Sequence, residues 1–427
     1  MTRTASSFIQ KNMFADTFSC SHQSVTVRRI CLAALLLFAL LPARAQMWDS
    51  LATSDYHLAT SDYHIDTAMV RALRVEVDNL TFFRDNEYSS QMTKGYSLPG
   101  LWIEPRLAYT PIRQIDLEVG LHASLFHGAN KYPNYVYHDI GRWKGSQYQR
   151  GAHVLPWVRA RAEFKHLTVV LGNIYGGQNH QLIEPLFNAE TNLSQDPEAG
   201  MQFLWDRKHL HADTWLNWQS YIFEEDSHQE AFTVGSSWKV LPGNQEKPLR
   251  WHIPVQLVIQ HRGGEQDTTS MGVQTIMNAS AGAGLTWTPR NHKVLTSVNA
   301  EANAMVAYQQ SGSIWPFDGG AAYHVGAGVT LWQRLLLRGG YFNAPKHFVS
   351  LYGNHFFSTL SVRNGQSYDG IGTAYAHVEY SHVFARRYVL GAEGEFFQSS
   401  MTGHNETNFS FGVYLRVNPS IIIKRWK

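Results

Sequence analysis

The chain has 427 residues, of which 44% are hydrophobic, 13% aromatic and only 16% charged. Soluble domains usually carry about a quarter charged residues, so this sequence is short of charge for its length. One stretch, residues 30–41, is continuously apolar, and it is shorter than the roughly 20 residues of a membrane-spanning helix. The composition disfavours disorder, collagen and helical bundles, and leaves many half-apolar strands as the main option.

Residues 1–45 have the layout of a secretory signal peptide. Two adjacent arginines precede the apolar core, and small residues at 43–45 follow it, so we expect cleavage after Ala45. The part before the core is long for such a signal, which makes Met13 a candidate start. The alternative is a short buried helix in a soluble protein.

Removal of residues 1–45 changes the chemistry that the mature chain can carry. Five basic residues and one acidic residue are lost, so the formal net charge changes from +2 to −2. A nearly neutral chain gives no electrostatic case for nucleic-acid binding. Cys20 and Cys31 are also lost, which excludes disulfides and cysteine-based metal sites. We expect an exported protein with no cofactor and no metal.

Residues 46–71 form a polar lead-in segment, and residues 72–427 follow a different pattern. The lead-in contains the heptapeptide LATSDYH twice, at 51–57 and at 58–64. After it, runs of 8–15 residues alternate between apolar and polar side chains, which is the period of a strand with one apolar face. In residues 115–125 every odd position is apolar, and the even positions are Asp, Glu, Gly, His and Ser.

The sequence contains about 16 such runs. They begin near residues 72, 101, 115, 151, 167, 199, 210, 230, 250, 277, 293, 319, 335, 368, 387 and 406. Short connections alternate with mostly longer ones, and the longer set includes 84–100, 129–150, 177–198, 263–276 and 347–367. This alternation predicts an up-and-down meander with short turns at one end and long loops at the other.

Aromatic residues support a membrane location for this meander. Rings on the apolar faces fall near the short-turn ends of their runs, at Tyr109, Phe164, Trp251, Tyr380 and Tyr388. Rings at one level of a barrel form the girdle of a membrane interface. The alternative, a soluble β-sandwich or propeller, has shorter strands, whereas these runs reach the roughly 9–11 residues of a tilted transmembrane strand.

From about residue 70 to its end, the chain resembles the bacterial outer-membrane β-barrel class, and its strand number resembles that of the 16-stranded porins. The resemblance implies an all-β fold, a transmembrane antiparallel up-and-down β-barrel with short periplasmic turns and long extracellular loops. Such barrels typically end on an aromatic residue. Here Pro419 interrupts the last run and Trp426 stands one position before the end, which leaves the closure of the last strand open.

If the apolar faces meet lipid, the polar faces line the lumen, and a barrel of this size is wide enough for an aqueous channel. The predicted pore-lining residues are Arg74, Glu76, Glu104, Arg106, Asp116, Glu118, Arg159, Arg161, Glu163, Glu301, Arg338, Glu379, Glu393, Glu395 and Arg416. The same alternation predicts inward aromatic side chains at Trp102, Trp157, Trp215, Tyr221 and Tyr375.

The loop 177–198 is the best candidate to fold into the lumen. Its acidic residues are Glu184, Glu190, Asp196 and Glu198. They would face a basic wall of Arg74, Arg106, Arg159 and Arg161, because the porins that this chain resembles set an acidic third loop against a basic wall. The alternative is a surface loop with ordinary solvated charges.

Two functions follow from this lining. In an open pore, lumen charges and an infolded loop select solutes. In a closed structural barrel, Arg159 pairs with Glu163 and Arg106 with Glu104, and the extracellular loops bind partners. We expect the pore, for passive diffusion of small hydrophilic solutes across the outer membrane of a Gram-negative bacterium, with outer-membrane lipid around it and a homo-oligomer as one option.

An enzyme is a third and less favoured interpretation. The chain contains no nucleophile elbow, no zinc-protease motif and no phosphate-binding loop, and His209 and His211 lack a third metal ligand. Outer-membrane lipid hydrolases place a serine, a histidine and a polar orienting group on the lipid-facing wall. The outward faces here read as almost purely apolar, so the sequence predicts no enzyme. A hidden site would need an outward His–Ser pair near a loop end.

Overall fold

The structure, a computed structural model, describes residues 63–127, 152–224, 226–264, 268–270, 272–291, 293–384 and 388–427. The expected signal peptide, most of the lead-in segment and the predicted loop 129–150 lie outside these residues. Within them, no helix is long and apolar enough to cross a membrane.

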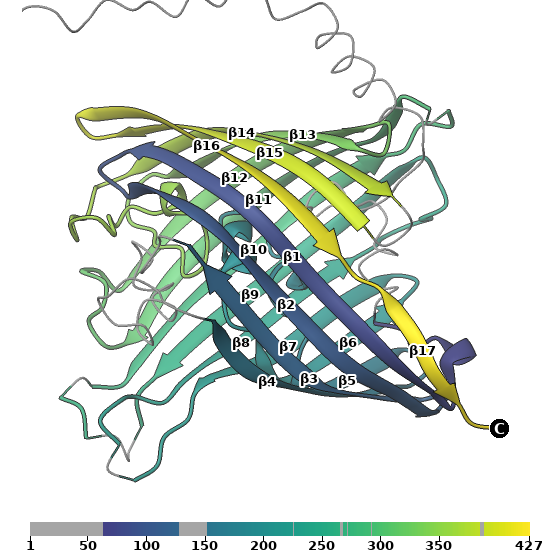
Figure 1. Cartoon of the computed structure of the whole chain (residues 1–427). Coiled ribbons are helices and arrows are strands. Elements are labelled where there is room, and N and C mark those ends of the chain that lie inside the picture. Colours follow the sequence, from purple (N-terminus) through teal and green to yellow (C-terminus); the bar gives the residue numbers. More distant parts are fainter. Residues whose placement is uncertain are drawn as a thin grey trace, which may run out of the picture. The chain divides into compact units, whose positions relative to one another are not determined.

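The described chain is a single antiparallel sheet that closes on itself (Figure 1). Its strands are β1 (Ala72–Ser89), β2 (Lys94–Ile112), β3 (Ile115–Phe126), β4 (His153–Glu163), β5 (Leu167–Asn173), β6 (Ala199–Arg207), β7 (Leu210–Ser220), β8 (Ala231–Val240), β9 (Leu249–Arg262), β10 (Gln274–Trp287), β11 (Leu295–Ser311), β12 (Gly319–Leu331), β13 (Leu335–Ala344), β14 (Ile371–Phe384), β15 (Tyr388–Met401), β16 (His404–Val417) and β17 (Ser420–Arg425). Short 3-10 helices are η1 (Thr67–Met69), η3 (Gly177–His180), η4 (Ala189–Leu193) and η5 (His355–Phe357). Each strand from β1 to β15 pairs with the next, and β1 pairs with both β16 and β17, which confirms the predicted up-and-down barrel.

The last strand closes the barrel in two sections. β16 pairs with β1 over residues 79–87 and β17 pairs with residues 72–76, so the two sections together form the sixteenth strand. Between them the carbonyl of Pro419 still accepts a hydrogen bond from the Val77 amide, at 3.0 Å. The ring of Trp426 packs edge-on against Tyr109, with centroids 5.3 Å apart. Pro419 therefore divides the closing strand without ending it.

The predicted strand starts agree closely with the structure except at β2. The predicted connection 84–100 is wrong, because β1 and β2 extend through it and leave a turn of residues 90–93. Gly95, Pro99 and Gly100 make this segment look like a loop. In the structure Pro99 and Gly100 pair with Phe83 and Phe82 of β1, because a complete partner strand holds them in register.

The two faces of the sheet differ as the alternation predicts. On β3, Leu117, Val119 and Leu121 are between 43% and 55% exposed on the outer face, whereas Asp116 and Glu118 are 1% and 6% exposed. Outward apolar side chains suit a hydrocarbon surrounding, and in lipid every backbone polar group must pair internally. A closed barrel meets both conditions.

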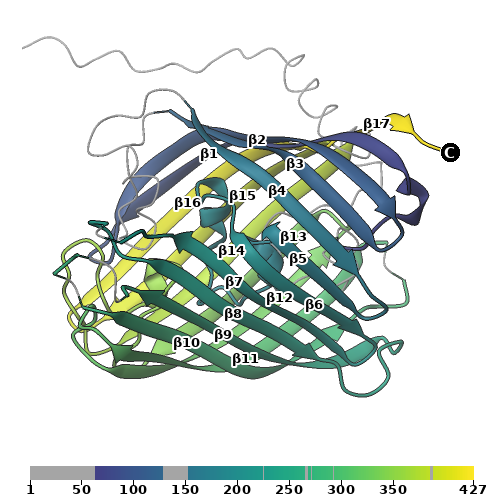
Figure 2. The same ribbon diagram turned by 90° about the horizontal axis from the view of Figure 1, so that it is seen from below.

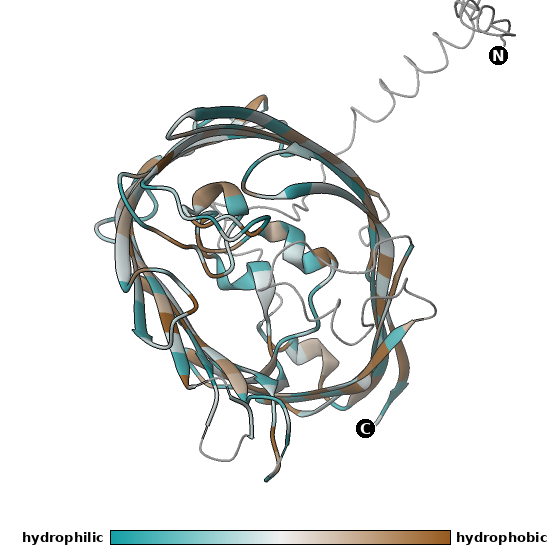
Figure 3. Ribbon diagram, turned by 90° about the vertical axis from the view of Figure 1, so that its left-hand side faces the viewer, coloured by the Kyte–Doolittle hydropathy of each residue, from teal (hydrophilic) through white to brown (hydrophobic). Residues whose placement is uncertain are grey.

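Two segments between strands lie inside the ring of strands (Figure 2, Figure 3). The inner segments are residues 174–198, between β5 and β6, and residues 345–370, between β13 and β14. They meet where Phe187 bridges to Tyr352 and the Asn188 amide donates to the Tyr352 carbonyl, at 2.7 Å. Their apolar side chains form a buried core with inward rings of the wall, and this core includes Leu182, Ile183, Leu186, Phe187, Leu193, Phe348, Leu351, Phe356, Phe357, Phe342, Tyr375 and Phe397. The two segments thus pack together and against the wall inside the barrel.

Candidate functional site

Arg84, on the inward face of β1, lies at the centre of a buried charge cluster. Its guanidinium is 2.9 Å from Glu190 of η4 and 2.8 Å from Glu393 of β15, and it also pairs with Glu395. Glu190 in addition accepts hydrogen bonds from Asn86 and from the Tyr96 hydroxyl. Burial of several carboxylates costs free energy unless cations and donors compensate it, and here one guanidinium serves three of them.

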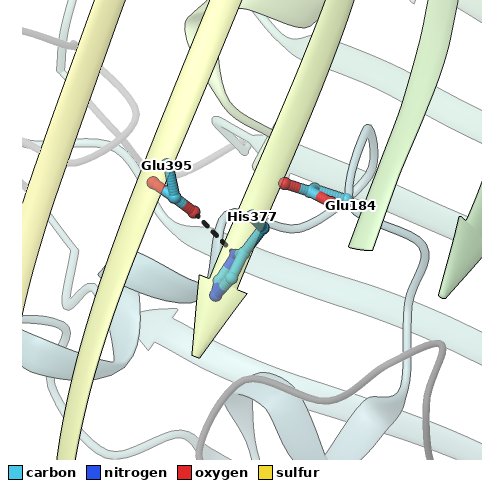
Figure 4. Close-up of side chains that lie close together, drawn as sticks. All are labelled: Glu184, His377 and Glu395. Carbon is cyan, nitrogen blue, oxygen red and sulfur yellow. Dashed lines mark ion pairs between the residues drawn. The ribbon is translucent and has the colours of Figure 1, made fainter. Parts of the chain in front are cut away.

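A second part of this cluster contains a group of side chains with metal-ligand chemistry (Figure 4). Glu184, His377 and Glu395 each have an atom within 4.8 Å of the other two. The guanidinium of Arg338 lies 3.4 Å from Glu184 and 3.1 Å from Nδ1 of His377. Because this guanidinium already supplies positive charge to the carboxylate and the imidazole, we assign the group to an ion-pair network rather than to a metal centre.

A separate network joins strands β1–β4 nearer the short-turn end. Asp116 bridges Arg74, at 3.0 Å, and Arg161, at 2.8 Å. Glu118 lies 3.6 Å from both Arg106 and Arg159. These two guanidiniums also lie over the ring of Trp157, 5.0 and 4.8 Å from its centroid. Acids and bases of the wall are therefore paired with one another.

The acidic residues of the predicted inward loop do not face the predicted basic wall. The structure places Glu184, Glu190 and Glu198 inside the barrel, where they pair with Arg338, Arg84 and His180. Asp196 pairs with His153, and the guanidiniums of Arg74, Arg106, Arg159 and Arg161 pair instead with acids of the wall. Asp116 and Glu118 both lie on β3, close to those guanidiniums, and pair with them in place of the acidic residues of the loop. A role of the loop as a constriction stays a prediction.

Other predicted contacts have mixed outcomes. Arg106 pairs with Glu104 at 3.4 Å, but the pairing of Arg159 with Glu163 is wrong, because Glu163 binds His64 at 2.6 Å. Tyr221 was predicted to point inward and is 64% exposed beyond the end of β7. The remaining predicted residues have these partners: Glu76 with Arg74, Glu301 with His252, Glu379 with Tyr414, and Arg416 with Asp78.

Arg84 was not predicted as a site residue. It lies in the predicted connection 84–100, where strand alternation assigns a side chain neither to the inner nor to the outer face. The sequence signal is interrupted, because the inward positions after Arg74, Glu76 and Asp78 are the apolar Leu80 and Phe82, and polar inward residues resume only at Arg84 and Asn86.

His180 fastens the inner segment 174–198 to the wall. Its ring nitrogens lie 2.7 Å from Asp213 and 3.2 Å from Glu198, and the ring stacks on Trp215 with centroids 3.5 Å apart. Burial lowers the pKa of His180, but the two carboxylates outweigh this effect and raise the pKa to about 9. The imidazole is therefore a buried cation that donates to both acids.

The outer wall carries one hydrogen-bonded imidazole–hydroxyl pair at the long-loop end of β9 and β10. His261 and Thr275 are cross-strand partners, and both stand at outward positions of their strands. Nδ1 of His261 is 2.9 Å from Oγ1 of Thr275, and Nε2 is 3.0 Å from the carbonyl oxygen of Gly263. A carbonyl only accepts, so Nε2 carries the proton and the Thr275 hydroxyl donates to Nδ1.

Gly263 orients this imidazole because its backbone turns sharply. Its φ of +91° lies in the region that favours glycine, directly after the end of β9. The turn brings the Gly263 carbonyl back onto the ring two residues earlier. A hydroxyl, a basic nitrogen and an orienting acceptor in this order are the elements of nucleophilic acyl transfer.

Aromatic rings continue the row across the neighbouring strands. The His261 ring stacks on Phe232 of β8, with centroids 4.9 Å apart, and Phe232 stacks on Trp218 of β7 at 5.2 Å. Trp218 is 40% exposed on the outer face. Aromatic side chains at one level of the wall are typical of a membrane–water interface, and such a row stands beside the pair.

A closed antiparallel barrel with an apolar outer face and a charged interior defines an outer-membrane β-barrel protein. Residues 65–426 match the family described as lipid A 3'-O-deacylase-type, and the chain belongs to this family. A search among curated proteins finds no match.

Solved outer-membrane proteins have a similar fold at low sequence identity. OpdK of Pseudomonas aeruginosa, solved with vanillate, is 9% identical, with a TM-score of 0.47 over 82% of this chain and 100% of its own. OccAB3 of Acinetobacter baumannii is 11% identical, with a TM-score of 0.46 over 82% of this chain and 99% of its own. A BenF-like porin of Pseudomonas fluorescens is 9% identical, with a TM-score of 0.47 over 82% and 100%.

The family match overturns the prediction that the protein is not an enzyme, because the family is named for a deacylase. The sequence predicts almost purely apolar outward faces because the predicted connection 263–276 contains Thr275, which is therefore not counted among the outward side chains. In the structure β10 begins at Gln274, so Thr275 belongs to the wall beside His261.

Replacement of Arg84 tests the buried cluster. Arg84→Met leaves three buried carboxylates without their shared cation, so we expect a loss of about 3–5 kcal/mol in the free energy of unfolding. Arg416→Met is the matched control, because the Arg416 side chain is 39% exposed and its pair with Asp78 contributes less than about 1 kcal/mol. Denaturant unfolding of the detergent-folded barrel measures both, and equal losses would contradict the assignment.

The pH dependence of stability tests whether the contacts of a charged His180 with Asp213 and Glu198 stabilise the fold. The folded pKa of about 9 lies above the ordinary value of 6.5, so the contribution of the charged ring is complete below pH 6.5. It is lost as the pH rises through about 9. We expect the difference in unfolding free energy between the wild type and His180→Gln to shrink over this window. A difference that stays constant from pH 6.5 to 9 would show that the ring is not a cation.

Proposed function

We propose that the protein hydrolyses an ester-linked acyl chain of a lipid in the outer leaflet, and that lipid A is its substrate, as the family name indicates. The observation that carries this proposal is the outward hydroxyl–imidazole–carbonyl arrangement of Thr275, His261 and Gly263. A lipid reaches this position from the side, by diffusion in the membrane, without entering the barrel.

The geometry suits acyl transfer through a covalent intermediate. The Thr275 oxygen attacks the ester carbon while its proton passes to Nδ1 of His261. His261 then returns that proton to the sugar oxygen that leaves, and the acyl group remains on Thr275. Water attacks this acyl ester, with its proton passing again through His261, and the fatty acid departs as Thr275 regains its hydrogen. The Gly263 carbonyl accepts from Nε2 in each step, which keeps Nδ1 as the nitrogen that takes up and returns the proton.

The buried core inside the barrel favours chemistry on the outer wall. Buried rings of both inner segments and of the wall occupy the lumen at the level of Phe187 and Tyr352. The stacked rings of Phe232 and Trp218 offer a rigid surface beside the pair at the depth of the lipid head groups. An acylated lipid could lie against these rings with its ester at Thr275.

A solute channel is the second candidate function. The observation in its favour is the number of charged side chains inside a 16-stranded barrel, including Arg74, Arg106, Glu118 and Arg161. Planar-bilayer recording decides between the two. Stable conductance steps of nanosiemens order would support the channel, whereas a folded barrel that stays silent would count against it.

Substitutions at the outward pair test the hydrolase. We expect Thr275→Val and His261→Gln each to lower the rate of fatty-acid release from lipid A by about 10²–10⁴, the usual contribution of a general base or nucleophile. Thr214→Val is the matched control, because Thr214 is an outward threonine of β7 that bonds to Ser236. Full activity in Thr275→Val with loss in His261→Gln would mean that His261 activates water directly. Full activity in both would place the chemistry elsewhere.

A further inference from the structure

The short-turn end of the barrel contains a pocket that the proposed hydrolase does not use. It lies between the turn that joins β4 to β5 and the turn that joins β6 to β7, with Tyr63 and His64 beside it. Its cavity of about 280 Å³ far exceeds the roughly 10–15 Å³ that one water molecule needs. A polyatomic ligand therefore fits between the two turns.

Three cations line this pocket without a partner. Lys165 comes from the first turn, and Arg207 and Lys208 come from the second. All three are exposed, and none of their side chains has an ion pair or hydrogen bond to a residue that the structure describes. Three positive charges that converge on one cavity attract an anion, and a guanidinium beside two ammonium groups matches the oxygens of phosphate.

The acidic residue of the pocket, Asp206, pairs with histidines and not with these cations. Asp206 is 2.7 Å from His211 and 3.6 Å from His64, so its carboxylate has two imidazole partners already. The second acid nearby, Glu163, binds His64 and the Ile65 amide. The two acids thus fix the lead-in segment in place, and neither forms an ion pair with the lysines or the arginine.

Aromatic side chains form the remaining wall of the pocket. Tyr63, Phe164 and Trp205 all line it, and Phe164 is 59% exposed on the outer face. The pocket therefore places cations beside apolar rings at the rim of the barrel. The cations suit the phosphate of a phospholipid head group, and the rings suit its acyl chains. The cations alone would also suit a free phosphate compound.

We propose that this rim pocket binds a phosphate group through Lys165, Arg207 and Lys208. The site lies at the periplasmic end of the barrel, opposite the long-loop end that holds His261 and Thr275. It does not rest on the proposed hydrolase, and a failure of either proposal leaves the other unaffected.

Calorimetric titration of the detergent-folded full chain tests the site with two probes, inorganic pyrophosphate and dihexanoyl phosphatidic acid. The pocket variant is Lys165→Gln/Arg207→Gln/Lys208→Gln. The matched control is Lys247→Gln/Arg290→Gln/Lys293→Gln, which removes the same charge from exposed positions of other turns at the same end. Heat-modifiable migration on gels checks that each variant is folded.

We expect the wild type and the control variant to bind at least one probe, and the pocket variant to bind it at least about tenfold more weakly, since each lost charged hydrogen bond costs more than 1 kcal/mol. Binding of phosphatidic acid alone would assign the site to a lipid head group, and equal binding of pyrophosphate would assign it to a free phosphate compound. Equal weakening in both variants, or no binding of either probe by the wild type, would overturn the proposal.

Discussion

Closure of the sheet in lipid is the constraint on which the rest of the structure depends. Because no water is available to the backbone there, β1 must pair with the last strand, and it does so through both β16 and β17. A closed sheet encloses an interior. Every second side chain of its strands points into that interior. The inward polar side chains are therefore buried in a confined space, where charged groups such as Arg84 and Asp116 need partners.

The fold was accessible from the sequence because strand alternation and turn composition are local properties. The partners inside the barrel were not, since they depend on which strands and segments meet across the interior. Arg84 and Glu393 are 309 residues apart, and no periodicity relates them. Local composition also gave the wrong connection at 84–100. Gly95, Pro99 and Gly100 are typical of a loop, but pairing with β1 holds this segment in a strand. Thr275 was hidden by the same kind of boundary error, one residue inside a strand that was expected to start later.

The structure separates its polar chemistry into two environments. Inside, carboxylates and guanidiniums are buried and mutually paired, as in the contact of Glu184 with Arg338, and the inner segments are fixed to the wall by such pairs. Outside, polar groups are few among apolar neighbours, so the contact of His261 with Thr275 stands apart from its surroundings. The buried pairs hold the interior together, and the outward pair is the group on which the proposed hydrolysis rests.

The position of Glu190 has a consequence for the order of assembly. This residue of η4 contacts Arg84 on β1, and Arg84 also binds Glu393 on β15, so the three residues connect the inner segment to both sides of the seam. Because β16 lies between β1 and β15, Arg84 contacts Glu393 only once β1 has paired with β16. The complete set of contacts around Arg84 therefore forms with the closure of the barrel. Folding then has an obligatory late step with contacts of very high sequence separation, and slow, all-or-none maturation is its kinetic signature.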